Sequence, residues 1–209
     1  MSKDEKLTVK ERYQIIINAR NFHYENFNKW LTYFYVAIGS LFIGYCTILA
    51  TNLDIVNKKQ LELLILGLGF LVSLLWYWSS KGYYFWNINF ISLVNYYEKE
   101  FLNLKEEERL YSVFANKNEQ NNFFNPIKGA NISTSKVAIL FAFLITNVWG
   151  FLILIEVYNP FNNLHTFWII IGEVLLSITA VFLLSLTVAK PFLKSKIDHM
   201  PDLKIKQEQ

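Results

Sequence analysis

The sequence has little of what most enzymes and secreted proteins use. It contains 1 cysteine, Cys46, so no disulfide can form within the chain and nothing indicates an oxidising compartment. It has no HExxH motif, no Cys/His cluster with metal-ligand spacing, no glycine-rich phosphate loop and no set of Ser, His and Asp that could form a triad. We therefore expect no enzymatic activity, no metal and no cofactor.

Charge is also scarce. Only 18% of the 209 residues are charged and 53% are hydrophobic, whereas a typical soluble domain has about 25% charged residues. The net charge of +3 is too small to suggest a nucleic-acid partner. The charges gather between long apolar stretches, which indicates a chain that lies partly in water and partly in lipid.

The sequence does contain four apolar stretches of the length that a helix needs to cross a membrane, about 20 residues each. None has a Lys or Arg in its interior. The alternative is a soluble protein with four buried helices, but the rest of the chain is too short to cover them. The predicted spans are residues 30–51, 61–80, 137–158 and 167–189.

The basic residues predict the orientation of these spans. Every Lys and Arg except Lys58 and Lys59 lies before the first span, between the second and third, or after the fourth. Because cytoplasmic segments are enriched in Lys and Arg, we expect both termini in the cytoplasm. The short links between spans one and two, and between spans three and four, then make two transmembrane hairpins.

Two amphipathic stretches extend the first hairpin. Apolar residues recur at i, i+3 and i+4 before the first span, and again after the second span up to about Arg109. Since the two spans form a hairpin, we expect the extensions to lie side by side, with Asn87 and Glu98 opposite the apolar face of the second. Arg20, on the apolar face of the first, is expected to pair with Glu98 or Glu100.

The predicted fold class is therefore all-α: a polytopic membrane protein with four transmembrane helices in two hairpins and a cytoplasmic helical stalk. Gly39 and Gly44 in the first span, and Gly67 and Gly69 in the second, are expected to allow close helix packing. The expected parts are a cytoplasmic amphipathic helix at 1–29, the first hairpin at 30–80, a cytoplasmic helix and loop at 81–136, the second hairpin at 137–189 and a cytoplasmic tail at 190–209.

Glu173 is the most unusual residue in a predicted span. It lies roughly 10 Å below the surface, given the rise of about 1.5 Å per helical residue, where a carboxylate usually faces the bundle interior or a water-filled cavity. One hypothesis is a pore lining, proton relay or cation site. The other is a protonated or hydrogen-bonded structural residue, paired with Asn147, Thr146 or Ser177. Asn147 is expected to bond between helices.

Residues 18–47 contain the element Ala19-Arg20-x-Phe22-His23 before an entry into the first span that is rich in Trp and Tyr. This stretch resembles the start of the RipA family of bacterial cytoplasmic-membrane proteins, which are described as octameric. The resemblance implies a homo-oligomer, an octamer, with no assigned chemistry. The candidate stalk or interface residues are Arg20, His23, Phe27, Trp30, Trp86, Phe90 and Glu98.

The layout of two spans flanked by cytoplasmic helices also resembles the membrane effectors of bacterial nucleotide-signalled phage defence, which are proposed to open the membrane as oligomers. Our leading hypothesis is a homo-oligomeric protein of the bacterial inner membrane that acts as a pore or scaffold. The alternatives are such a membrane-disrupting effector, or a non-conducting signalling protein whose stalk recruits a cytosolic protein. The expected partners are the lipid bilayer and further copies of the chain.

Overall fold

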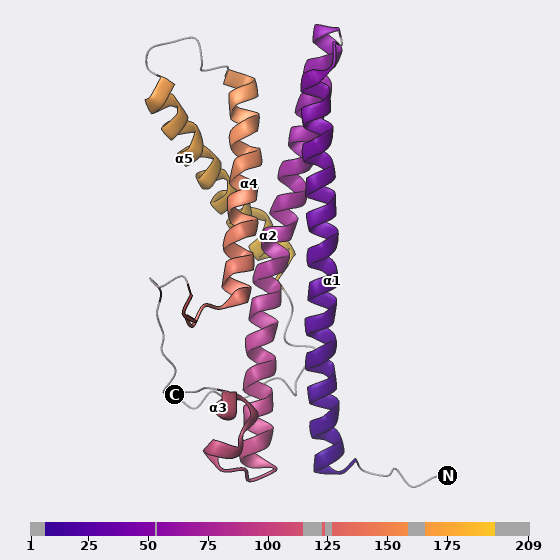
Figure 1. Cartoon of the computed structure of the whole chain (residues 1–209), viewed down its shortest axis with the longest axis vertical. Helices are drawn as coiled ribbons and strands as arrows, with labels where there is room; N and C mark the ends of the chain where they lie inside the picture. The colour runs from indigo at the N-terminus through magenta and orange to yellow at the C-terminus, as the bar shows by residue number, and fades with distance from the viewer. Residues whose placement is uncertain (1–6, 53, 115–122, 124–126, 159–165, 195–209) are drawn as a thin grey trace, which may run out of the picture. The chain divides into compact units, whose positions relative to one another are not determined.

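The computed structural model describes residues 7–52, 54–114, 123, 127–158 and 166–194 (Figure 1). The link at 159–165, the tail from residue 195 and most of the loop before residue 127 lie outside this range. The helices are α1 (Val9–Ala50), α2 (Ile55–Glu100), α3 (Leu110–Phe114), α4 (Thr134–Tyr158), α5 (Thr166–Leu184) and α6 (Lys190–Phe192), with a 3-10 turn at Glu106–Glu108 and a π-helical segment at Ser185–Ala189.

The all-α prediction is confirmed for the described residues, which form helices and no strands. Four helical segments are long and apolar enough to cross a membrane: α1, α2, α4 and the segment Trp168–Phe192, which contains most of α5. Helix α1 begins well before its predicted span and helix α2 ends well after its own, because each span and its amphipathic extension form one unbroken helix.

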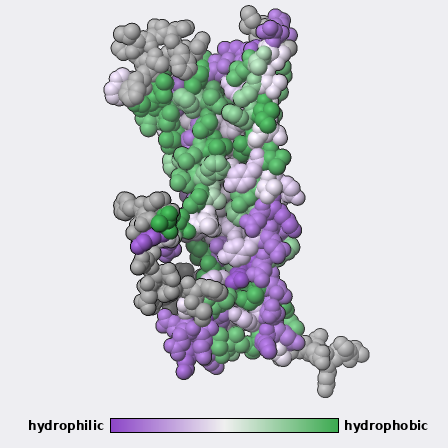
Figure 2. Space-filling model, in the orientation of Figure 1, coloured by the Kyte–Doolittle hydropathy of each residue, from purple (hydrophilic) through white to green (hydrophobic). Residues whose placement is uncertain are grey.

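The described chain forms two compact units, and α1 and α2 each contribute to both. Unit 1 takes the described residues within Met1–Asn28 and Tyr83–Ser133, and unit 2 those within Lys29–Gly82 and Thr134–Ser195. In the view of Figure 2, apolar side chains gather over the α4 and α5 part of unit 2 and hydrophilic side chains over unit 1. This difference in surface is consistent with a unit 2 that is embedded in lipid.

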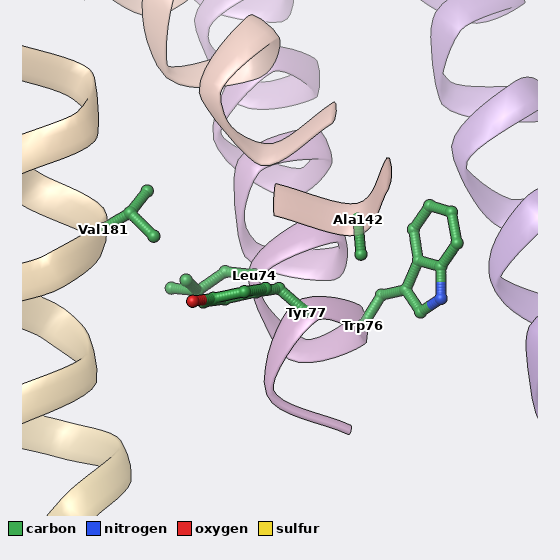
Figure 3. Packing of buried hydrophobic residues seen from close by; sticks show 5 residues of the cluster. All are labelled: Leu74, Trp76, Tyr77, Ala142 and Val181. Atoms are coloured by element: carbon green, nitrogen blue, oxygen red, sulfur yellow. The ribbon is translucent and has the colours of Figure 1, made fainter. Parts of the chain in front are cut away.

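Unit 2 has an apolar core between its helices. One cluster joins Leu74, Trp76 and Tyr77 of α2 to Ala142 of α4 and Val181 of α5. Figure 3 shows Leu74 and Tyr77 directed toward Val181, with Trp76 on another side of α2. The Trp76 ring lies against α1, because it has ring neighbours there in Phe34 and Tyr35, at 6.1 and 5.1 Å.

Two glycines let the helices of unit 2 approach closely. A Cβ at Gly69 of α2 would overlap the Trp149 ring of α4, and a Cβ at Gly150 would overlap the Ser177 hydroxyl of α5. The prediction of close packing thus holds for Gly69, and Gly44 has a tight neighbour in the Ile65 side chain at 3.3 Å. Within one chain it does not hold for Gly39 and Gly67, where nothing lies within 4 Å of an added Cβ.

One row of buried residues in helix α2 repeats every seven positions. Leu66, Ser73, Ser80, Asn87 and Val94 are all buried, with no more than 8% of any of them exposed. A seven-residue repeat is typical of helices that pack along a continuous seam. The expectation that Asn87 faces away from the packed side is therefore wrong, because the heptad seam places it inside.

The same helix ends earlier than predicted, at Glu100 and not near Arg109. Asn103 has a φ of 53°, in the left-handed region that Asn tolerates better than most residues. The amides of Leu102 and Leu104 donate to the carbonyls of Tyr97 and Glu98. Such bonds satisfy the free carbonyls of a last helical turn and reverse the chain.

Candidate functional site

Unit 1 is organised around the buried carboxylate of Glu98, which is 1% exposed. One oxygen accepts a hydrogen bond from the hydroxyl of Tyr13 on α1. The backbone amide of Leu110, at the start of α3, donates to both oxygens at 3.3 and 3.1 Å. Glu98 therefore ties three helices together within unit 1, although the sequence places it opposite the apolar face of its helix.

The contact with Glu98 also affects Tyr13. Burial of the ring, together with the hydrogen bond to Glu98, raises the pKa of Tyr13 to about 12. The phenol therefore keeps its proton throughout the physiological pH range and remains a hydrogen-bond donor. A hydrogen bond to a charged group is worth about 1.5–3 kcal/mol, which makes this contact a strong constraint on unit 1.

Arg20 does not pair with Glu98 or Glu100, contrary to the sequence-based prediction. Its guanidinium donates to the Tyr111 hydroxyl at 2.9 Å and to the side-chain oxygen of Asn21. It also lies 5.7 Å from the centre of the Tyr111 ring. The groups that bond to Glu98 in its place are the Tyr13 hydroxyl and the Leu110 amide.

His23 lies in an aromatic stack between α1 and α2. Its ring is 4.7 Å from the Tyr83 ring and 5.3 Å from the Phe90 ring, and Phe27 stacks on the same Tyr83 at 3.5 Å. Burial lowers the pKa of His23, which favours the neutral imidazole at neutral pH. The structure thus brings together three of the candidate stalk residues, His23, Phe27 and Phe90.

The two remaining candidates lie apart from this stack. Trp30 belongs to unit 2, is 58% exposed and has ring neighbours in Tyr33 and Phe34 on its own helix. Trp86 has its printed ring contact with the adjacent Phe85, at 5.6 Å.

Glu173 of α5 is a buried glutamate of unit 2, as is Glu62 of α2, and its surroundings are opposite to those of Glu98. Only 6% of the residue is exposed, and neither carboxylate oxygen has a hydrogen-bond partner among the described residues. The predicted pairing with Asn147, Thr146 or Ser177 is therefore wrong. Because the chain itself encloses Glu173, this carboxyl group does not line an open pore in this arrangement.

Asn147 does join two helices, as expected. The Ser177 hydroxyl of α5 donates to the side-chain oxygen and to the carbonyl of Asn147, at 3.2 Å each. The Asn147 amide nitrogen donates to the Phe143 carbonyl at 2.8 Å. These bonds hold α4 against α5 one helical turn away from Glu173.

Sequence reasoning missed three residues that complete unit 1: Tyr13 as a donor to Glu98, Tyr111 as the partner of Arg20, and Asn87. Asn87 is only 8% exposed, and its side-chain oxygen has no partner among the described residues. The seven-residue spacing from Ser80 could have indicated its burial. No cluster of three or more His, Cys, Asp or Glu that could hold a metal ion occurs in the described part of the chain.

The fold and its sites therefore define an α-helical membrane protein with four candidate transmembrane helices. Residues 10–158 match the sequence model of the octameric membrane protein family (8xMP). This match covers well over half of the 209 residues, and the chain belongs to that family. It includes α1, α2 and α4, and it ends before α5 and Glu173. No curated protein and no solved structure matches the chain.

Proposed function

We propose that the protein is a homo-octameric scaffold of a bacterial cytoplasmic membrane, related to the RipA proteins and without enzymatic activity. The family supports the octamer. The distribution of Lys and Arg supports an orientation with both termini in the cytoplasm. In this orientation unit 1 is cytoplasmic and unit 2 crosses the membrane.

One side of α1 carries this proposal. Among the described residues Tyr45 is the only buried one on α1. The exposed side of α1 carries small or hydroxyl-bearing residues at seven-residue spacing on either side of Ile43, the α1 stripe: Gly39 with Cys46, and Ser40 with Thr47. In membranes such residues gather where two helices approach closely, so a neighbouring protomer fits the α1 stripe better than lipid does.

Unit 1 also exposes large apolar side chains. Ile15 and Phe22 of α1 and Phe85 and Ile88 of α2 are between 43% and 63% exposed. These positions lie outside the predicted spans, where lipid tails cannot cover them. A ring of identical subunits would bury such surfaces without leaving an open edge.

A scaffold fits the polar groups of unit 2 better than a pore does. Glu173 is enclosed within one protomer, and the Thr47 hydroxyl of the α1 stripe donates to the Ile43 carbonyl of its own helix at 2.8 Å. A conducting pore needs polar groups that face a shared axis and remain available to ions. Glu173 and Thr47 do not meet that requirement in this arrangement.

The test is the mass of the particle in nanodiscs for Gly39→Leu and for a matched control, Gly172→Leu. An added Cβ meets nothing within 4 Å at either glycine, so neither change disturbs the protomer. We expect octamers for wild type and Gly172→Leu, and smaller species for Gly39→Leu. An unchanged octamer in Gly39→Leu would exclude the α1 stripe as the subunit contact, and a monomeric wild type would refute the assembly.

The same samples in liposomes separate a scaffold from a pore. A scaffold predicts that wild-type octamers leave the ion permeability of the vesicles at its basal level. Ion flux that is present in wild type and lost in Gly39→Leu would refute the scaffold and support an oligomeric pore.

A further inference from the structure

Glu173 is held in an apolar part of the protein with nothing to stabilise a negative charge. It lies two turns from the start of α5 at Thr166, about 10 Å along the helix axis. The residue is 6% exposed, and both of its carboxylate oxygens are buried and lack a hydrogen-bond partner in the described residues. An isolated buried carboxylate is among the most costly groups in a folded protein.

The polar groups nearby already bond to one another. The Asn147 amide nitrogen donates to Phe143, and the Ser177 hydroxyl donates to Asn147. The Thr146 hydroxyl donates to the Ala142 carbonyl at 2.8 Å. None of these polar groups bonds to Glu173 in the described structure.

The close contact of α4 with α5 also limits the space for water. Gly150 of α4 lies so near Ser177 that even a Cβ would overlap the Ser177 hydroxyl. Ser177 is one helical turn from Glu173, on the same side of α5. On the side of Ser177, therefore, water has no path to the carboxyl group between α4 and α5 as they are packed here.

The charged groups of the neighbouring helices do not compensate Glu173 either. Lys59 of α2 lies 3.8 Å from Glu156 of α4. Lys58 of α2 donates to the carbonyls of Leu49 and Thr51. The ionisable groups of unit 2 toward the α1–α2 link are Tyr45, Cys46, Asp54, Lys58, Lys59, Glu62, Glu156 and Tyr158. No hydrogen bond or ion pair joins any of them to Glu173 in the described structure.

We propose that Glu173 is a membrane-embedded proton-binding site, occupied by a proton while α4 and α5 are packed as they are here. The proton can leave only to water that reaches the carboxyl group, and the carboxylate that remains requires hydration. Proton release and separation of α4 from α5 are therefore linked. Raising the pH favours the separated arrangement, and lowering the pH favours the packed one. This proposal concerns groups within one protomer and does not rest on the octameric assembly.

The first test is infrared spectroscopy of the full chain in liposomes, titrated from neutral to alkaline pH. A carboxyl group without hydrogen bonds gives a C=O stretching band at unusually high frequency. We expect this band in wild type and its loss in Glu173→Gln. Glu98→Gln is the control and should keep the band, because the oxygens of Glu98 accept hydrogen bonds and do not give rise to it. A band that survives Glu173→Gln, or the absence of a band in wild type at neutral pH, would overturn the proposal.

A second variant keeps the test valid if Glu173→Gln does not fold. Met has nearly the shape of a protonated Glu and no charge, so Glu173→Met is expected to leave the thermal midpoint unchanged at neutral pH. It is also expected to remove any loss of stability of unit 2 at alkaline pH. A large fall in the midpoint at neutral pH would mean that a charged Glu173 stabilises the fold, and that result would refute the proton-binding site.

Discussion

Glu98 and Glu173 are both buried carboxylates, but only one of them has partners. In unit 1, Glu98 accepts hydrogen bonds from Tyr13 and from the Leu110 amide. In unit 2, neither oxygen of Glu173 has a partner among the described residues. Burial alone therefore does not say what a carboxylate does. Glu98 acts as a joint between helices, whereas Glu173 stabilises no contact and needs a proton to remain where it is.

The largest effect is expected at Glu98. Glu98→Ala leaves the Tyr13 hydroxyl and the Leu110 amide without their acceptor, at a cost of about 3 kcal/mol in the free energy of unfolding. Denaturant unfolding in mild detergent measures the loss, and Glu98→Gln, which keeps one acceptor oxygen, should lose less. A change in Glu98→Ala as small as that in Glu173→Met would remove the distinction between the two carboxylates.

The next effect is a packing defect within unit 2. Gly69→Ala places a methyl group in the space of the Trp149 ring, which should cost about 2 kcal/mol of unfolding free energy through overpacking. Gly67→Ala, two residues away on the same helix, is the matched control because nothing lies within 4 Å of its Cβ. Equal thermal midpoints for the two variants would contradict the close approach of α2 and α4.

Removal of one donor from Glu98 should have a smaller effect. Tyr13→Phe deletes the hydroxyl but keeps the ring and leaves the Leu110 amide in place, so we expect a loss of about 1–2 kcal/mol. Tyr24→Phe on the same helix is the control, because the Tyr24 ring, and not its hydroxyl, contacts Tyr83. Hydrogen exchange of the amides in residues 9–28 and 83–100 should increase in Tyr13→Phe and not in Tyr24→Phe.

The smallest effect concerns His23 and pH. Burial lowers the pKa of His23 in the folded state, so the neutral ring contributes stability that is present above the unfolded pKa of about 6.5 and is lost as the pH falls below it. Hydrogen exchange in unit 1, corrected for the intrinsic pH dependence, should therefore increase on acidification in wild type. His23→Phe should weaken this dependence, and an unchanged dependence would assign it to another group.

The sequence was sufficient to predict the helical class and the four candidate spans, because apolar length decides them. It was insufficient for the polar contacts. Arg20 and Glu98 are suitable partners by charge, but Glu98 accepts its hydrogen bonds from Tyr13 and the Leu110 amide. Leu110 follows the turn at Asn103, which the charge pattern does not reveal. The depth of Glu173 was readable from the sequence, whereas its lack of a partner depends on how Ser177 and Asn147 bond to each other.

We propose that copies of this chain assemble around α1. Photo-cross-linking in membranes tests this assembly most directly. A photoreactive phenylalanine analogue would be placed at position 43, where Ile43 is 68% exposed beside the α1 stripe. The control places the same analogue at position 140 of α4, where Leu140 is 57% exposed. We expect a ladder of cross-linked species from position 43 that ends at the octamer, and no such ladder from position 140. A ladder from Leu140 alone, or monomers from both positions, would contradict it.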